Sequence, residues 1–470
     1  MQVTLPREKL TITAISGLES EAAHLELDLT GNHPATVDIH LPRFVDLKSQ
    51  SWHSANTHLH LMKLTREDAD RYLAEIPRAD RLDMLFVSYL ERAGADHEYI
   101  TNRLTSNDLS DLAARSGVIF GNGEEHRHNL AGYGEGYGHV MFLNIAKLIQ
   151  PVSIGPGIMK TGTDGLPLQR GVDTARRDAA TVVWCHNGMG LETLANIATG
   201  RVDAQNIFDG GNRGSYADSF YQYWNAGFPV PISTGTDWFI YDLSRVYTRT
   251  TTPNSQPAPL SLPTWLASLK RGNSFITNGP ILDFKIHPAS NDPAIPPTDI
   301  GETLDLPHPT RLTCIGTARS RSDFHQLELV RNGEIIATSP SHPVDNHFES
   351  TIRFEFQSTE PAWLALRTPP PLEKKTDTAK PDPQSAPTRP HPTNEFGREI
   401  FAHTSPIHIH HSGKPYFHPP TADKLLQRMQ SNRDHIATYA NFADPQQRAA
   451  VLDIHHDAIE TMTEHLNRNR

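Results

Sequence analysis

The chain has 470 residues, which at roughly 150 residues per domain corresponds to about three structural units. Its 43 Lys and Arg residues and 54 Asp and Glu residues give a net charge of −11, so the chain as a whole does not attract nucleic acid or anionic lipid. No apolar run approaches the roughly 18 residues that a membrane-spanning helix needs. We therefore expect a protein that binds neither nucleic acid nor membranes.

The pattern of hydrophobicity divides the chain into four successive segments. Residues 1–50 alternate between apolar and polar positions, the period of half-buried strands, and we expect them to pack with a β-domain. Residues 51–285 alternate short apolar runs with helical stretches, as in an α/β barrel or a doubly wound sheet. The expected helices lie at 65–75, 106–114, 172–180, 191–199 and 217–226. Thr65, followed by Asp68, resembles a capping box at the first of them.

Residues 286–418 return to the strand pattern and predict a β-sandwich. Asn332 and Gly333 lie between two apolar runs and predict a type I′ hairpin turn. The stretch 369–395 is rich in proline and charge, which predicts a disordered surface loop. Residues 419–470 predict two helical segments divided near Asp444 and Pro445, which we expect to dock on the barrel or on a second subunit of a homo-oligomer.

Two observations bear on the cellular compartment. The N-terminal residues lack the basic and apolar regions of a signal peptide. Cys185 and Cys314 are the two cysteines of the chain, too few for a disulfide framework. Both observations favour a cytoplasmic setting, although a mature secreted chain would share them.

Histidine is the unusual residue, with 26 in the chain, and it is the commonest metal ligand in proteins. His58 and His60 are two residues apart, so in a strand they project from one face and can bind one ion. A His-x-His pair is common by itself, but further apolar runs of this chain begin or end on Glu124, Glu125, His139, His186 and Asp237. That pattern is typical of a barrel whose catalytic face lies at the carboxyl ends of its strands. The mixture of imidazole and carboxylate suits zinc, manganese or iron.

These motifs resemble the PHP (polymerase and histidinol phosphatase) superfamily of metallohydrolases, and within it the carbaryl-hydrolase-like CehA/McbA branch. The matching segments are WHSANTHLH at 52–60, GEEH at 123–126, CHNG at 185–188, STGTDW at 233–238 and, most specifically, WLASLKRGNSFITNGP at 265–280. The resemblance covers roughly residues 36–418 and does not extend to the helical tail.

The resemblance implies a distorted (β/α)7 barrel that holds one or two divalent transition metals, zinc before manganese or iron. Six residues match the family's ligand motifs: His58, His60, Glu125 and Asp237 for one metal, with Glu125 bridging to a second metal held by His139 and His186. Glu124 is the alternative bridging residue, but Glu125 fits the G-x-E pattern better.

The chain also departs from the family pattern. The stretches LMKLTRED, LFVSYLE and TDWF lack the residues that bind the third metal of the superfamily, so we expect that third site to be absent. Asn56 stands where the opening motif usually has an aspartate, which weakens the expected support of a ligand histidine.

The activity implied is metal-assisted hydrolysis of an ester, carbamate, amide or phosphoester of a small molecule, with ester bonds as the first expectation. Glu125 holds the metals together and Asp237 is the candidate proton acceptor. Candidate substrate contacts are His126, His128, Tyr241 and Arg245, although SRVYTRT also reads as a structural strand around Arg245. A two-metal phosphoesterase and a non-catalytic, carbohydrate-binding protein with a degenerate site are the alternatives.

Several other residues resemble ligands and are interpreted as structural. The second His-x-His pair, at 408–410, is expected on a sheet surface of the β-domain. His455 and His456 are expected on an exposed helix surface. Strand alternation is expected to turn Cys185 away from the face of His186.

Overall fold

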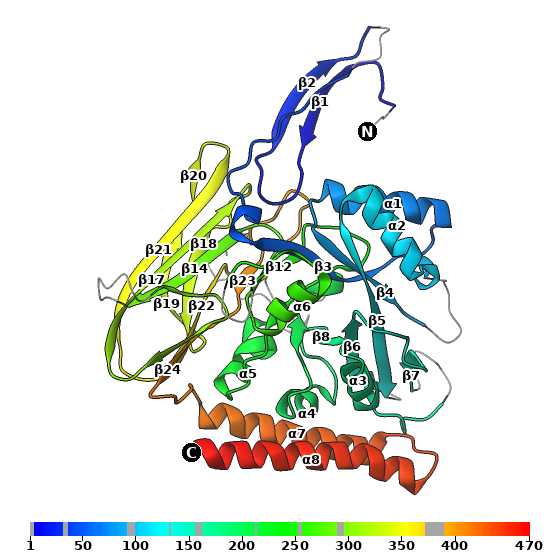
Figure 1. Cartoon of the computed structure of the whole chain (residues 1–470), viewed down its shortest axis with the longest axis vertical. Coiled ribbons are helices and arrows are strands. Elements are labelled where there is room, and N and C mark those ends of the chain that lie inside the picture. The colour runs from blue at the N-terminus through cyan, green and yellow to red at the C-terminus, as the bar shows by residue number, and fades with distance from the viewer. Residues whose placement is uncertain are drawn as a thin grey trace, which may run out of the picture.

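The computed structural model describes residues 4–31, 36–91, 99–130, 133–155, 162–211, 214–251, 256–288, 296–371 and 390–470, with the backbone alone at 130 and 133–135. The chain forms a barrel-like sheet with surrounding helices, a β-sandwich beside it, an N-terminal hairpin and a C-terminal helix pair (Figure 1). The prediction of a mixed α/β region followed by a sandwich and a helical tail is thereby confirmed.

The barrel-like sheet is built around β3, the strand that carries the first His-x-His pair. Its strands are β3 (Trp52–His60), β4 (Met84–Tyr89), β5 (Ile119–Leu130), β6 (Tyr133–Leu143), β7 (Ser153–Ile154), β8 (Thr181–Cys185), β9 (Ala204–Asn206), β10 (Ile232–Ser233) and β11 (Asp237–Trp238). β3, β4 and β5 are parallel, β6 is antiparallel to both β5 and β8, and β8, β9 and β10 are again parallel. β11 pairs in parallel with the end of β3, so the sheet curls back onto its first strand.

Helices cover the outside of this sheet. They are α1 (Arg66–Ala79), α2 (Ser106–Ser116), α3 (Leu168–Arg177), α4 (Thr193–Ala198), α5 (Gln222–Asn225) and α6 (Leu262–Lys270). Every helix predicted for this region is present, although the last is a π-helical turn that runs into α5. The Thr65 hydroxyl accepts a hydrogen bond from the backbone N–H of Asp68 at 3.1 Å, as the capping pattern predicted.

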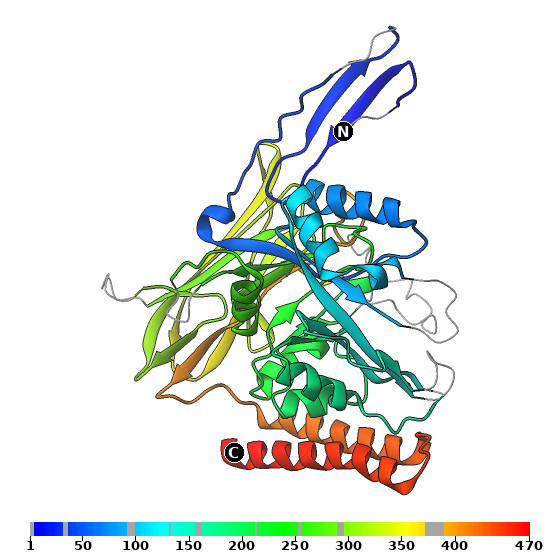
Figure 2. The same ribbon diagram turned by 45° about the vertical axis from the view of Figure 1, so that its right-hand side comes forward.

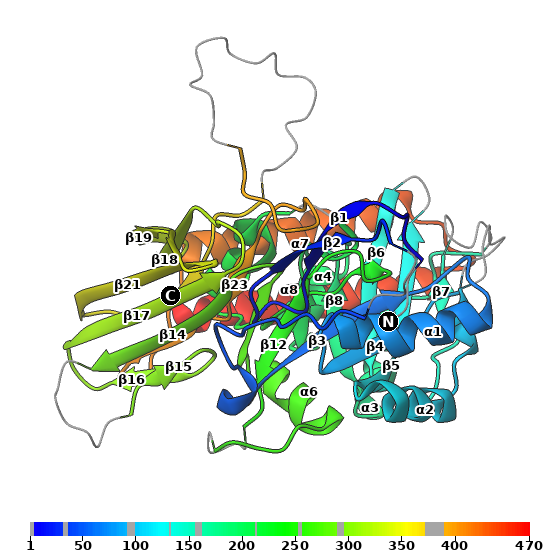
Figure 3. The same cartoon turned by 90° about the horizontal axis from the view of Figure 1, so that it is seen from above.

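The sheet continues from β3 through β12 (Arg245–Arg249) and β13 (Ser274–Thr277) into one layer of the sandwich. That layer adds β16 (Thr303–Leu306), β18 (Gln326–Arg331), β19 (Glu334–Pro340), β22 (Ala362–Arg367), β23 (Ala402–Thr404) and β24 (Ile407–His411). The opposing layer is β15 (Thr298–Asp299), β14 (Ile281–Pro288), β17 (Thr310–Ser320), β21 (His347–Ser358) and β20 (His342–Val344). Seen from above, the sandwich lies on one side and the barrel-like sheet on the other (Figure 3).

Local turn chemistry in the sandwich agrees with the sequence. Asn332 and Gly333 join β18 to β19 with φ angles of 54° and 99°, the left-handed pair that a type I′ turn requires. Phe284, Leu329 and Leu366 are fully buried in the core of the sandwich. Residues 372–389, most of the stretch expected to form a disordered loop, lie outside the described residues.

The N-terminal strands β1 (Lys9–Ala14) and β2 (Ala23–Asp28) form a hairpin that projects from the body of the molecule (Figure 2). The base of the hairpin contacts the sandwich. The Arg321 guanidinium donates hydrogen bonds to the backbone oxygens of Gly17 at 2.6 Å and Ser20 at 2.9 Å. These contacts agree with the expected packing of residues 1–50 against the β-domain.

The tail helices α7 (Pro419–Tyr439) and α8 (Pro445–Asn469) lie side by side against the barrel region (Figures 1 and 2). Leu425, Met429 and Met462 of the tail share an apolar cluster with Leu194 and Tyr223 of the barrel region. Because α8 packs in this way, His455 is buried, and its expected exposure was wrong. Within the described residues, we find no helix that combines the length and the apolar character needed to cross a membrane.

Candidate metal centre

The predicted ligands converge inside the barrel-like sheet. His58 and His60 project inward from the end of β3, and Asp237 lies beside that strand in register with Leu59. Glu125 projects inward from β5, while His139 lies on β6 and His186 directly follows β8. The structure therefore brings together all six residues that were matched to ligand motifs.

Four of these residues form a compact, buried group: His58, His60, Glu125 and Asp237, with one ligand atom of each within 4.8 Å of the others. His60 Nε2 lies 2.9 Å from Glu125 Oε2, and His58 Nε2 lies 3.4 Å from Asp237 Oδ1. The two Nε2 atoms of His58 and His60 face each other at 3.0 Å.

The orientation of the two rings suits a cation. His60 Nδ1 lies 3.0 Å from the backbone oxygen of Ser88, and His58 Nδ1 lies 3.0 Å from Asp209 Oδ2. Since each Nδ1 faces an oxygen acceptor, it carries the ring proton, and the lone pair of a neutral ring is then on Nε2. Two lone pairs at 3.0 Å repel unless a proton or a metal ion lies between them. The donor set of two imidazoles and two carboxylates therefore fits a divalent transition metal.

The charges of the group also favour a bound cation. Burial alone would lower the pKa of His58, but Asp237 and Asp209 raise it well above its ordinary value, so a proton is held where a metal ion would bind. Asp237 Oδ1 is buried, and no described residue donates a hydrogen bond to it. A buried carboxylate oxygen that lacks a hydrogen-bond donor and lies beside two ring nitrogens is the environment that a cation satisfies.

Asp209 was missed as a functional residue by the sequence analysis. It follows β9 in a short 3-10 turn, and its two carboxylate oxygens lie 3.0 Å from His58 Nδ1 and 2.6 Å from His186 Nδ1. One carboxylate thus fixes two imidazoles with their Nε2 atoms toward the centre, the usual arrangement behind metal-binding histidines. A usable signal was present, because Asp209 follows an apolar run in the same way as Asp237 does.

Asn56 supports the centre from within β3. Its side-chain oxygen accepts hydrogen bonds from the backbone N–H groups of His58 at 3.1 Å and Thr236 at 3.2 Å. Its amide nitrogen donates to the Thr236 hydroxyl at 2.7 Å. Asn56 therefore ties β3 to the segment that carries Asp237.

A second group shares Glu125 with His139 and His186. Glu125 Oε1 lies 3.5 Å from His139 Nδ1 and 3.8 Å from His186 Nε2. Arg127, which the sequence analysis did not single out, approaches the same oxygen with its Nε at 3.3 Å. Burial alone would raise the pKa of Glu125, but Arg127 and the surrounding imidazoles hold it well below its usual range, so the carboxylate is charged.

Alternation along β5 places Glu124 on the opposite face from Glu125. Glu124 accepts a hydrogen bond from the backbone N–H of Ile149 at 2.7 Å and pairs with His126 Nδ1 at 2.8 Å. His128, on the same outer face, stacks on the Tyr137 ring with 3.7 Å between centroids. Both histidines are fully buried outside the barrel-like sheet, so their suggested role as substrate contacts was wrong. Glu125 is the glutamate that faces the centre.

The two remaining candidate substrate contacts, Arg245 and Tyr241, differ in their surroundings. Arg245 is fully buried, and its guanidinium donates hydrogen bonds to the Asp80 carboxylate at 2.8 Å and to the backbone oxygen of Leu243 at 2.9 Å. Its place is in the core, as the strand interpretation predicted. Tyr241 lines a cavity of about 410 Å³ together with Phe208 and Arg398, next to the loop of Asp209. Tyr241 therefore remains a candidate substrate contact.

Cys185 was expected to face away from the centre, and this was wrong. Its sulfur, His58, His186 and Asp209 each offer an atom within 4.8 Å of the others. Cys185 is the last residue of β8 and faces inward like Val183, after which the chain turns and directs His186 inward as well. Burial raises the pKa of the Cys185 thiol, which favours its protonated form.

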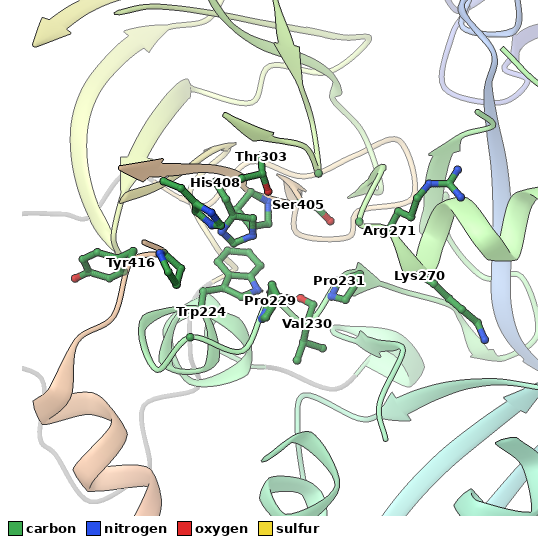
Figure 4. A pocket seen from close by; sticks show the side chains of 16 residues that line it. Trp224, Pro229, Val230, Pro231, Lys270, Arg271, Thr303, Ser405, His408 and Tyr416 are labelled. Atoms are coloured by element: carbon green, nitrogen blue, oxygen red, sulfur yellow. Dashed lines mark hydrogen bonds between the residues drawn. The ribbon is translucent and has the colours of Figure 1, made fainter. Parts of the chain in front are cut away.

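The second His-x-His pair lies elsewhere. His408 and His410 line a cavity of about 340 Å³ with Trp224, Arg271 and Tyr416 (Figure 4). The cavity borders the residues that precede β10 and β13, which is the end of the parallel strands opposite to the metal-ligand candidates. None of its lining residues belongs to the candidate metal centre.

Comparison with models of known families, with curated proteins and with solved structures gave no match to this chain. The functional assignment therefore depends on the geometry of the centre.

Proposed function

We propose that this protein is a metal-dependent hydrolase that uses a metal-activated water on an ester, carbamate, amide or phosphoester bond of a small molecule. One observation carries the proposal: two imidazoles and two carboxylates are buried together with their ligand atoms within 4.8 Å of one another, and each histidine is held by an acceptor on its far side. Such support behind the ligands distinguishes a metal site from a chance group of buried polar residues.

The residues around the centre have separable roles in this proposal. When bound, a divalent ion lowers the pKa of water and polarises the substrate oxygen. Asp237 accepts the proton that the attacking water loses, since its Oδ1 is free of described donors and burial raises the pKa of its carboxyl. Asp209 holds His58 and His186 in place, and Glu125 links the two groups of ligand candidates.

The order of strands and the motifs at their ends support a place in the PHP superfamily, with a distorted (β/α)7 barrel. In this chain the strand β6 runs antiparallel to its neighbours, so the repeat is irregular between β5 and β8. A two-metal phosphoesterase is the second candidate function, favoured by the group of Glu125, His139 and His186. That group would supply the second ion of such a centre.

Metal content and a substrate panel test the proposal together. Purified protein is expected to contain a transition metal by mass spectrometry and to hydrolyse at least one of the p-nitrophenyl acetate, carbamate, phosphate and phosphodiester substrates. The His60→Ala variant is expected to lose both metal and activity. His410→Ala is the matched control, because it removes one histidine of the other His-x-His pair. A chain that binds no transition metal, or a His60→Ala variant with full activity, would contradict the proposal.

A further inference from the structure

We propose that Arg127 occupies the second cation position of this centre, so that the chain binds one divalent ion, at the group of His58, His60, Glu125 and Asp237, with a fixed guanidinium beside it. This inference rests on the proposed function, since it concerns how the same centre balances its charge. It separates the two candidate functions, because a two-metal phosphoesterase needs the position that Arg127 takes.

The position of Arg127 follows from strand geometry. Arg127 is two residues beyond Glu125 on β5 and is paired with His139 in the antiparallel register of β5 and β6, so all three side chains share the inner face. Its Nε donates a hydrogen bond to His139 Nε2 at 3.1 Å and lies 3.3 Å from Glu125 Oε1. The guanidinium thus contacts two of the three residues that would hold a second metal.

The hydrogen bond to His139 conflicts with metal binding by that ring. A nitrogen that accepts an N–H hydrogen bond uses its lone pair for it, and the proton of a neutral imidazole is then on the other nitrogen. With Arg127 bonded to Nε2, His139 presents N–H at Nδ1 toward Glu125 Oε1, 3.5 Å away. His139 would have to become an imidazolate or release Arg127 before it coordinated an ion. Arg127 and a second metal therefore exclude each other.

The charge of the centre fits one ion and one guanidinium. Three carboxylates lie in it, from Glu125, Asp209 and Asp237. One divalent ion and Arg127 together supply three positive charges and balance them with all imidazoles neutral. Two divalent ions, with Arg127 displaced, would leave one excess positive charge in a site whose ligand candidates are buried, which is costly in a medium of low polarity.

Arg127 also differs from the ligand candidates in its exposure. Its side chain is 17% exposed, whereas that of Glu125 is fully buried and that of Asp237 is 8% exposed. A partly exposed guanidinium next to a metal site can bind the oxygen of an incoming substrate as well as hold Glu125. The substrate class that follows is one whose scissile group carries or develops negative charge on oxygen.

Metal stoichiometry tests this inference independently of activity. Each variant is saturated with zinc or manganese, desalted and analysed by mass spectrometry for ions per chain. We expect one ion in the unchanged chain, one in Arg127→Lys, which keeps the charge, and two in Arg127→Ala. The double variant Arg127→Ala/His139→Ala is expected to return to one ion.

His139→Ala in the otherwise unchanged chain keeps the test decisive if Arg127→Ala fails to fold. We expect that variant to retain one ion, whereas in a two-metal centre the same change would lower the count from two to one. Two ions in the unchanged chain, or one ion in a folded Arg127→Ala variant, would overturn the inference while leaving the metal-dependent hydrolase standing. An unchanged chain that binds no ion would instead defeat the proposed function itself.

Discussion

Strand β5 carries a buried glutamate on each of its faces, and the two faces are organised differently. On the inner face, Glu125 lies within 2.9 to 3.8 Å of nitrogen atoms from four imidazoles: His58, His60, His139 and His186. On the outer face, Glu124 pairs with His126 at 2.8 Å, and His128 lies 3.3 Å from Asp164. Both faces are therefore buried and rich in histidine and carboxylate.

The two faces differ in whether their histidines point toward a common centre. The outer histidines belong to separate pairs with separate partners, and each behaves as a polar side chain that the core accommodates. The inner rings direct their nitrogens toward one carboxylate and are fixed from behind by Asp209 and by the Ser88 carbonyl. Residue type and burial are thus common to both faces, and only the inner arrangement creates a place for a cation.

The largest expected difference between the two faces of β5 is in metal affinity, when one glutamate at a time is neutralised. Glu125→Gln removes the carboxylate shared by both groups of ligand candidates and is expected to lower metal affinity by more than about 100-fold. Glu124→Gln, one residue away, is expected to change metal affinity by less than about twofold, since its side chain bonds to Ile149 and His126. Titration against a competing chelator measures both, with circular dichroism to verify folding. Equal losses in the two variants would show that the inner face is not the metal site.

Acidification is expected to weaken metal binding. Burial opposes protonation of His58 and His186, but neighbouring carboxylates raise the pKa of both rings well above the ordinary value, so the metal-free centre holds protons that an ion must displace. Each displaced proton lowers apparent affinity by about tenfold per pH unit as the pH falls below that raised pKa. Chelator competition between pH 6 and 8.5 measures the slope. A pH-independent affinity would contradict the assignment of these two rings.

Removing the charge of Asp209 is expected to have a smaller effect on metal affinity. Asp209→Asn keeps the size of the side chain but cannot accept hydrogen bonds from both His58 Nδ1 and His186 Nδ1 with the same strength. We expect metal affinity to fall by about 10- to 100-fold, the usual cost of losing a supporting carboxylate behind metal ligands. Asp218→Asn, on the exposed side of the following turn, serves as the control and should have no effect. An Asp209→Asn variant with unchanged affinity would show that Asp209 does not orient the ligands.

The comparison also shows what the sequence can predict. The period of two places His58 and His60 on one face of β3, whereas the full set of six ligand candidates, with Glu125 preferred over Glu124, came from the resemblance to the motifs of a known family. The turn at Asn332 and Gly333 and the cap of α1 at Thr65 depend on neighbouring residues and were likewise predicted.

Contacts between distant segments were not predictable from local patterns. Asp209 meets His58 across 151 positions of the chain, Arg127 meets His139 only because β6 turns back on β5, and His455 is buried only because α8 docks on the barrel region. The outer histidines were misjudged for a related reason. His126 and His128 occupy the face that the covering segments close, and alternation alone does not say which face of a strand is the inner one.

The smallest effect is expected on the outer face, where the pKa of a histidine is shifted in the opposite direction from those of His58 and His186. Burial lowers the pKa of His128, so the unfolded chain takes up this proton at a higher pH than the folded chain does, and stability is lost as the pH falls below about 6.5. His128→Gln removes this titration and the hydrogen bond that Nδ1 accepts from the backbone N–H of Tyr137.

We expect His128→Gln to lower the free energy of unfolding at neutral pH by about 1 kcal/mol and to make its decline toward pH 5 shallower. Metal affinity should stay the same, because the side chain lies on the other face of β5 from Glu125. Urea unfolding of the metal-free chain at several pH values measures the first effect, and chelator competition measures the second. His455→Gln is a useful companion, since burial lowers the pKa of His455 to about 4, far from β5, and should give the same change in pH dependence. If His128→Gln weakened metal binding tenfold, the two faces of β5 would be coupled, and the separation drawn between a metal centre and buried structural pairs would fail.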